Sequence, residues 1–426
     1  RDEQVSAKGK GAMNTYWLAI GVGSAYLNAS SVGSGEDLHA NSEMLKNDPE
    51  ASRRSDMKKS RLVDWVSEIL MEHIKKVVIV HERCYKRTSM ANEDLRYDAP
   101  EGSMPLDEVR EAITMPKFDF KVADAALDSQ LVNVPSDISD LLREYVSLIA
   151  DSYRDNPFHN FEHACHVTMS VNKLLSRIVT PDLANTPAKI MLKKGRNEVA
   201  ADIHNFSHGL TSDPMAVFAI VFSALIHDAD HQGVSNVQLV KEEPGMGEMY
   251  HNKSVAEQNS LDLAWDMLMS KQFDKLRKYI FGTRAEMLRF RQLIVNVVLA
   301  TDIFDKELGQ LRKDRWNQAF HGDESLATDH VNNLRATIVM EHIIQASDVS
   351  HTMQHWHVYQ KWNRKLFKEM YQAYKAGRMG ADPSGFWYQG ELGFFDNYII
   401  PLSKKLKECG VFGVSSDEYL GYALKN

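Results

Sequence analysis

The stretch AVFAIVFSALI, residues 216 to 226, is apolar around the whole circumference of a helix. A helix without a polar face has to be buried, so this stretch requires a large core around it. The chain then turns polar at once, with His227, Asp228 and His231 in HDADHQGVSN. Burying such groups is costly unless they are paired or bind a metal. Imidazole and carboxylate together suit Zn²⁺ or Fe²⁺, and a carboxylate can also bridge to Mg²⁺ or Mn²⁺.

Two further segments end in polar side chains of the same kinds. In PFHNFEHACHV, residues 157 to 167, His159 and His163 are four positions apart and share one helix face. In IIQASDVSHT, an apolar helix ends at Asp348. A pair of surface histidines, or an ordinary helix-terminal acid, explains either segment taken alone. Three polar helix ends, at 163, at 227 to 228 and at 348, together favour a metal site.

From about Val109 to the C-terminus the pattern is helical. Apolar residues recur at helical spacing in the segments 136–154, 251–269, 287–304 and 331–350, and the first of them opens with a capping Ser or Asp. No alternating strand pattern with hairpin turns follows residue 108. The sequence therefore predicts an all-α fold, with a compact multi-helix domain over residues 109–426.

The first hundred residues differ from the rest. Residues 28–60 are rich in Ser, Asn, Asp, Glu and Lys and predict a flexible linker. Residues 61–84 carry a helical apolar stripe, which fits a helix packed on its own domain as well as a connector helix that joins two copies in a homodimer. We therefore assign residues 21–108 to a linker that contains this connector helix.

Composition limits the class of protein. The formal net charge of -8 argues against a nucleic-acid surface. Three scattered cysteines, Cys84, Cys165 and Cys409, indicate reduced thiols in the cytosol. The longest apolar run is shorter than the roughly 20 residues that span a bilayer. Because the chain begins at Arg1, we expect a fragment of a longer protein, and membrane attachment of that protein would use segments outside this chain.

Five motifs occur in a fixed order: FHN-x-x-H, HDADHQGVSN, LATD, SDVS and GFFDNYIIPL. Over roughly residues 110–420 they resemble the catalytic domain of class I cyclic nucleotide phosphodiesterases, which has an HD-type metal site. Separately, KGKGAMNTYWL resembles the closing residues of a class III nucleotide cyclase domain. Residues 1–20 are accordingly interpreted as a cyclase remnant, in a protein that fuses a cyclase to a phosphodiesterase.

The resemblance implies a two-metal site for hydrolysis of 3′,5′-cyclic nucleotides to 5′-monophosphates. The first metal, Zn²⁺, would be held by His163, His227, Asp228 and Asp348, and Asp228 would bridge to a second ion, Mg²⁺ or Mn²⁺. His159 would be the general acid that protonates the leaving oxygen of the substrate. Glu257 would be the carboxylate behind that imidazole, His231 and Thr301 would hold water near the metals, and His166 would be structural.

The resemblance also places the nucleotide base. Phe394 and Leu366 would clamp it, Asn236 and His159 would contact the substrate, and Glu391 stands where the family has a purine-binding Gln. A carboxylate accepts hydrogen bonds only, which favours the two adjacent donors of guanine and hence cGMP. The chain departs from the family pattern at Phe158, commonly Tyr, and at Asn259 and Ser260, often a His pair.

Two alternatives remain at this point. One is a phosphohydrolase that acts on linear nucleotides, which the clamp motif around Phe394 disfavours. The other is a silent nucleotide-binding module that regulates the attached cyclase, and the retention of His159 with all four metal ligands disfavours it.

Overall fold

The computed structural model describes residues 5–7, 11–13, 49–84, 105–178, 195–322 and 327–426. The chain divides into two units, Arg1–Ser55 and Asp56–Asn426. In the first unit, β1 (Val5–Ala7) pairs antiparallel with β2 (Gly11–Met13), with Val5 opposite Met13. Most of the predicted cyclase remnant, and of the linker on either side of its helix, lies outside the described residues.

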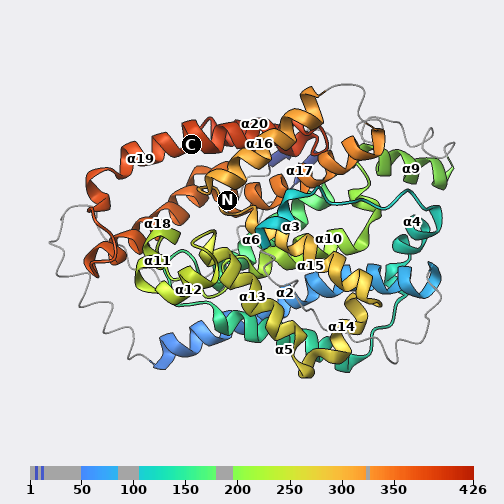
Figure 1. The fold of residues 1–426 in the computed structure, drawn as a ribbon, viewed down its shortest axis with the longest axis horizontal. Coiled ribbons are helices and arrows are strands. Elements are labelled where there is room, and N and C mark those ends of the chain that lie inside the picture. Colours follow the sequence, from blue (N-terminus) through green and yellow to red (C-terminus); the bar gives the residue numbers. More distant parts are fainter. Residues whose placement is uncertain (1–4, 8–10, 14–48, 85–104, 179–194, 323–326) are drawn as a thin grey trace. The chain divides into compact units, whose positions relative to one another are not determined.

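The described elements of the second unit are helices, which confirms the predicted all-α class (Figure 1). The first of these helices, α2, begins at Pro49 in the first unit and continues into the second. The first half of the series is α2 (Pro49–Cys84), α3 (Pro105–Arg110), α4 (Phe120–Leu127), η1 (Ser129–Leu131), α5 (Ser136–Ser152), α6 (Phe161–Ser176), α9 (Arg196–Phe206), η2 (Leu210–Ser212), α10 (Pro214–Ile226), α11 (Asn236–Glu242), α12 (Pro244–Met249), α13 (Val255–Met269) and η3 (Lys271–Phe273). The remainder are α14 (Asp274–Ile280), α15 (Arg284–Leu299), α16 (Lys306–His321), α17 (Thr328–Asp348), η4 (Ser350–Met353), α18 (Trp356–Lys375), η5 (Pro383–Gly385), α19 (Trp387–Phe394), the π-helical η6 (Phe395–Ile399), α20 (Ile400–Glu408) and α21 (Val414–Ala423).

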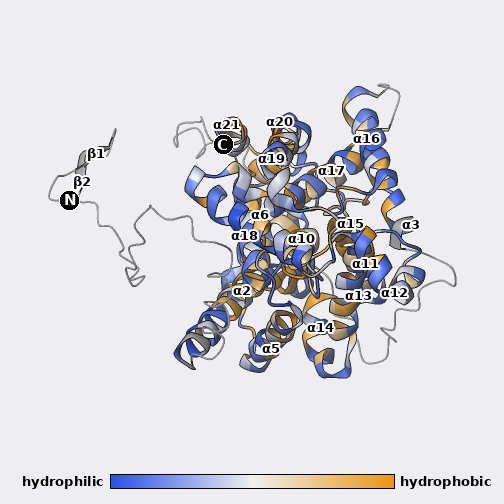
Figure 2. Ribbon diagram, turned by 90° about the vertical axis from the view of Figure 1, so that its left-hand side faces the viewer, coloured by the Kyte–Doolittle hydropathy of each residue, from blue (hydrophilic) through white to orange (hydrophobic). Residues whose placement is uncertain are grey.

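Helix α10 is the apolar stretch that the sequence places in the core. Asp213 caps its first turn by accepting from the Ala216 amide, and Pro214 occupies a position where no amide hydrogen is needed. Nearly all its side chains are buried, against α6 on one side and α15 on another. Figure 2 shows α10 as largely hydrophobic ribbon inside the helical unit.

Helix α2 includes the predicted connector range 61–84 but begins at Pro49. The difference has a local cause, because residues 49–60 contain several good helix formers and neither a Pro nor a Gly after Pro49. The apolar stripe of α2 is buried within its own chain, from Val63 through Val80. The packing therefore matches the interpretation of a helix docked on its own domain.

Among the described residues, none of the helices has both the length and the apolar composition to cross a membrane. Three of the packed helices matter most for the site. Helix α6 packs on α10 and α17, and α10 also contacts α17. The start of α6 and the ends of α10 and α17 are thereby brought together.

Candidate active site

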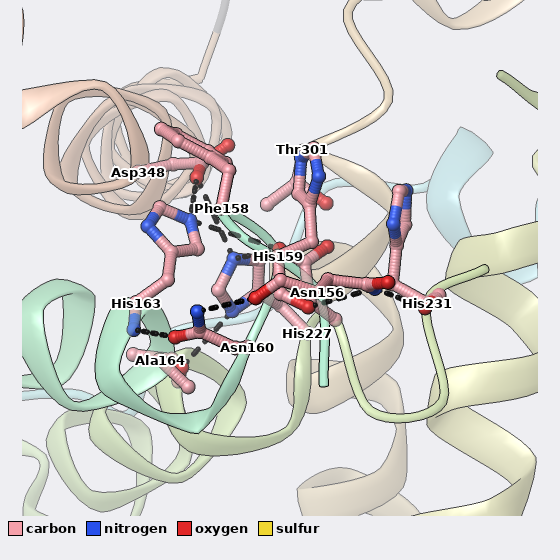
Figure 3. Close-up of polar contacts among 12 residues, drawn as sticks. Asn156, Phe158, His159, Asn160, His163, Ala164, His227, His231, Thr301 and Asp348 are labelled. Carbon is pink, nitrogen blue, oxygen red and sulfur yellow. Dashed lines mark hydrogen bonds and ion pairs between the residues drawn. The ribbon is translucent and has the colours of Figure 1, made fainter. Parts of the chain in front are cut away.

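Four side chains at the ends of these three helices converge on one point, and Figure 3 shows three of them, His163, His227 and Asp348. His163 lies in the first turn of α6, His227 and Asp228 follow α10, and Asp348 is the last residue of α17. Their ligand atoms all lie within 4.8 Å of one another. His163 Nε2 is 3.0 Å from Asp348 Oδ1, and His227 Nε2 is 3.2 Å from Asp228 Oδ2.

The donor set fits a divalent metal. His227 Nδ1 is 3.0 Å from the Ala224 carbonyl, to which it donates. Its Nε2 lies 3.2 Å from Asp228 Oδ2 and 3.5 Å from Asp348 Oδ1, and although burial lowers the pKa of His227, these carboxylates raise it well above its ordinary value. The nitrogens and oxygens of the cluster therefore need a positive charge between them, which a proton or a bound cation supplies, and two imidazoles with two carboxylates are a donor set that Zn²⁺ accepts.

Two asparagines fix the backbone around this cluster. Asn160 caps α6 by accepting from the His163 amide at 3.1 Å, while its side-chain amide donates to the Asn156 carbonyl at 2.7 Å. Asn156 in turn donates to the carbonyls of His159 at 3.0 Å and His231 at 2.7 Å. The segments that carry three histidines are thus joined by two side chains (Figure 3).

The carboxylate behind His159 is Glu369 on α18, which corrects the prediction of Glu257. Glu369 Oε1 pairs with His159 Nδ1, and Oε2 accepts from the amides of Phe158 at 2.8 Å and His159 at 2.9 Å. Burial lowers the pKa of His159, but the Glu369 carboxylate outweighs it and raises that pKa to about 9. His159 is therefore protonated at neutral pH, with Nε2 left as the donor.

His231 has the opposite protonation state from its neighbour. Its ring lies 4.0 Å from that of His159 between centroids. Burial, and next the charge on His159, lower the pKa of His231 to about 4. Its Nδ1 accepts from the Gly233 amide at 3.1 Å, so Nε2 carries the hydrogen. His231 is a neutral hydrogen-bond donor beside a charged imidazole.

Glu257 lies in the first turn of α13 and is not the partner of His159. It accepts from Asn236 at 2.9 Å, and burial followed by the nearby Asp302 raises its pKa to about 8. Asn236 also accepts from the Ala256 amide at 2.8 Å. The sequence motif LATD contains Asp302, but we assigned no role to that acid. Glu257 and Asp302 together form a buried acidic pair suited to a second cation or to water bound around one.

The remaining predicted residues near the metals have local partners. Thr301 donates to the Val298 carbonyl at 2.7 Å, which leaves its oxygen free to accept. His166, expected to be structural, packs its ring 5.1 Å from that of Trp362. The residues that replace the family's His pair are tied to loop 229–230: Asn259 donates to Asp230 and Ser260 to the Ala229 carbonyl.

The predicted base-binding residues lie on α18 and α19. Leu366 is on α18, and Glu391 is three residues before Phe394 on α19. Glu391 Oε2 accepts from the Tyr359 hydroxyl at 2.6 Å and from Asn363 Nδ2 at 2.5 Å. These two bonds join the helices that carry the proposed clamp, and they occupy only one of the two carboxylate oxygens. Burial raises the pKa of Glu391, and the bonds from Tyr359 and Asn363 oppose that rise.

Sequence reasoning missed Glu369, although a signal for it exists. Tyr359, Trp362, Glu369 and Ala373 are the buried positions of α18 and recur at helical spacing. An acid on an otherwise apolar stripe needs a buried partner. Asn156 and Asn160 were also missed, and an Asn just before the predicted start of α6 is an ordinary capping signal.

Comparisons with known proteins identify the family of this chain. The family model of 3′5′-cyclic nucleotide phosphodiesterases matches residues 158–410. The chain is 27% identical over 268 residues to the probable 3′,5′-cyclic-AMP phosphodiesterase pde-4 of Caenorhabditis elegans, covering 61% of this chain and 35% of that protein. It is 28% identical over 271 residues to isoform F of a Drosophila melanogaster 3′,5′-cyclic-AMP phosphodiesterase, covering 61% and 36%.

A bovine relative, the dual specificity calcium/calmodulin-dependent 3′,5′-cyclic nucleotide phosphodiesterase 1B, is 24% identical over 263 residues, covering 59% of this chain and 41% of its own length. The chain thus spans well under half the length of these relatives. The phosphodiesterase domain of Salpingoeca rosetta rhodopsin phosphodiesterase has the same fold, with a TM-score of 0.52 at 19% identity, covering 81% of this chain and 93% of that one.

Proposed function

This chain belongs to the 3′,5′-cyclic nucleotide phosphodiesterase family, and we propose that it hydrolyses 3′,5′-cyclic nucleotides to 5′-monophosphates, with a preference for cGMP. One observation carries the proposal. The cluster of His163, His227, Asp228 and Asp348 lies beside His159, an imidazole that Glu369 keeps protonated. A metal-ligand set next to a buried, charged proton donor is what cleavage of a phosphate ester requires.

The chain's own groups supply the proton and the orientation. When bound, divalent ions would activate the attacking water and neutralise charge on the phosphate. The water oxygen bonds to phosphorus, the bond to the 3′-oxygen breaks, and His159 Nε2 gives its proton to that oxygen. The proton that the water loses goes to solvent, from which His159 recovers its own. His231 donates a hydrogen bond without competing for the proton, because it is neutral.

The metals are assigned by their ligands. The mixed set of two imidazoles and two carboxylates favours Zn²⁺ at the cluster. Glu257 and Asp302 offer only carboxylate oxygens to an ion, which favours Mg²⁺ or Mn²⁺ there, held largely through water because Asn236 and Ser254 already donate to these carboxylates. Elemental analysis of the purified protein tests both assignments.

The preference for cGMP rests on the direction of the hydrogen bonds at Glu391. The indole of Trp387 can only donate, and it donates to Asn363 Oδ1 at 3.2 Å, so Asn363 Nδ2 must face Glu391. Asn363 Nδ2 also donates to the Tyr359 oxygen at 3.3 Å, so the Tyr359 hydrogen points to Glu391 as well. Glu391 Oε2 is therefore fixed as an acceptor, and an ionised Oε1 offers only lone pairs. Guanine presents two adjacent donors to such a group, whereas adenine presents one donor beside an acceptor.

Release of 5′-GMP and 5′-AMP from the two cyclic nucleotides, with and without a chelator, tests the function. We expect chelator-sensitive hydrolysis with the higher kcat/KM on cGMP. A protein that binds cyclic nucleotide without turnover would be the silent regulatory module, and turnover of linear nucleotides alone would place it among other phosphohydrolases.

The wider organisation is also proposed. The resemblance of KGKGAMNTYWL to the end of a cyclase domain supports a natural protein in which a nucleotide cyclase precedes this domain. We further propose that the catalytic domain works in the cytosol. A homodimer through α2 would have to use the side of the helix opposite its buried stripe. Sequencing of the full transcript and the molar mass of the purified chain in solution test these points.

A further inference from the structure

A cluster of charges joins helix α2 to α6 and α18, two of the helices that carry the site. Glu162 is the second residue of α6, directly before the metal-ligand candidate His163. Its Oε2 lies 2.8 Å from Lys58 Nζ on α2 and 2.9 Å from Lys365 Nζ on α18. Lys361, also on α18, is 3.5 Å from its Oε1. One carboxylate thus connects three helices.

Glu162 and Lys365 both lie near groups that the proposed reaction uses. Lys365 Nζ lies 4.3 Å from the ring centroid of Trp362, and this buried ring lies 5.6 Å from that of His163. Glu369, which holds His159, is one helical turn after Lys365 on α18. Glu162 and Lys365 thus lie next to a metal-ligand candidate and one helical turn from the partner of the acid.

The remaining contact of Glu162 is with Lys58, in the part of α2 that has no fully buried side chain among those described. The described side chains of α2 before Val63 are exposed or only partly buried, and the apolar anchoring begins at Val63. Residues 58–60 reach the rest of the domain through polar side chains, namely Lys58 to Glu162, Lys59 to Asp151 and Ser60 to Arg143. Exposed ion pairs of this kind contribute little to stability one by one, so this part of the helix can dock or release at small cost.

We propose that Glu162 is a positioning residue, and that the cluster of Lys58, Glu162 and Lys365 is the route by which α2 acts on the reaction. When Lys58 is paired with Glu162, α6 and α18 are held in the relative position that places His163 and His159. Release of Lys58 loosens that position, so whatever precedes α2 in the chain can control turnover. The inference rests on the proposed hydrolysis for its activity readout, and metal retention provides a second, independent one.

The experiment compares point variants of the full chain. Glu162→Gln and Lys58→Gln each remove one charge of the cluster, and Lys58→Arg keeps it. Lys59→Gln is the matched control, because it breaks an ion pair of α2 with Asp151 on α5, a helix that holds none of the site residues. For each protein, kcat, KM, Tm and the metal retained against a series of chelator concentrations are measured.

We expect Glu162→Gln and Lys58→Gln to lower kcat or metal retention by about threefold to tenfold, the usual size of coupling between elements. KM should stay close to that of the parent, because Glu391 is held by Tyr359 and Asn363 and not by this cluster. The Tm of both variants should match that of Lys59→Gln, and Lys58→Arg should restore the parent values. The double variant Glu162→Gln with Lys58→Gln should be no worse than Glu162→Gln alone, because both changes remove one interaction.

Variants that equal the parent in both kcat and metal retention would overturn the inference, as would an equal loss in Lys59→Gln. An inactive parent would instead count against the proposed function. In that case metal retention alone decides whether the cluster positions His163.

Discussion

The ligand cluster takes its side chains from helix ends, whereas the face formed by α18 and α19 takes its polar groups from within helices. His163, His227 and Asp348 stand where α6 begins and where α10 and α17 end. Glu369 and Glu391 are surrounded by helix on both sides. A helix end leaves backbone groups unpaired, and capping and polar residues in the sequence indicate where it lies. A buried polar group inside a helix is explained only by its partner on another helix. The first region can therefore be found by local inspection, whereas in the second the sequence signals that a buried acid needs a partner but not which residue that partner is.

The largest effect should come from breaking the ligand cluster. Asp348→Ala removes one of four ligands, and we expect loss of the tighter metal and of measurable hydrolysis. The Tm should fall as well, because metal binding stabilises the folded state. Elemental analysis, hydrolysis assays and thermal unfolding measure the three effects. Asp329→Ala, at the exposed start of the same helix, is the control. Full metal content in Asp348→Ala would contradict the assignment.

Replacing the general acid His159 should show that proton donation and metal binding depend on different residues. His159→Ala should keep both metals and lose about 10²- to 10⁴-fold in kcat, the usual effect of removing a general acid. A substrate with a better leaving group at the 3′-position should recover part of the rate. The measurements are kcat on both substrates and metal content. An unchanged rate on the natural cyclic nucleotide would refute the role.

The next largest effect should come from replacing Glu369 on α18, the partner of His159. Glu369→Gln removes the carboxylate that raises the pKa of His159 to about 9. Burial then lowers that pKa, so the protonated, active form is lost at a lower pH. We expect the alkaline limb of the pH–kcat profile to shift downward, with a loss of about tenfold or more at pH 8 and a smaller one at pH 6, since one pKa unit is tenfold in protonated fraction. An equal loss at both pH values would indicate a purely structural role.

The smallest effect should appear in substrate choice. In Glu391→Gln, the network of Tyr359 and Asn363 should turn the amide oxygen toward itself and present the amide NH₂ to the base. A donor then replaces an acceptor, and the ratio of kcat/KM for cGMP to that for cAMP should fall several-fold, within the 1–3 kcal/mol or so of one bidentate base contact. Asn363→Ala, which removes one donor to Oε2, should change the ratio less. An unchanged ratio in Glu391→Gln would leave selection to another residue.

Particular residues show how far the sequence could be followed. The apolar run 216–226 and the abrupt polar end after it placed α10 in the core and His227 with Asp228 at its end, and the structure has both there. The start of α2 at Pro49 was missed because a charged, polar segment can form a helix when nothing in it breaks one. Glu257 was paired with His159 by resemblance, but His159 pairs with Glu369 and Glu257 accepts from Asn236.

By itself the sequence determined the helical class, the buried position of α10 and the three polar helix ends that favour a metal site, because these follow from helical spacing and from the cost of burying polar groups. The full set of metal-ligand candidates came from the family resemblance. The tertiary structure decided which carboxylate meets which imidazole. Glu369 lies far along the chain from His159, yet it sets the pKa of that acid, and His231 beside it stays neutral. Protonation depends on burial and on charges a few ångströms away in space, and only the packing of α6, α10, α17 and α18 fixes those distances.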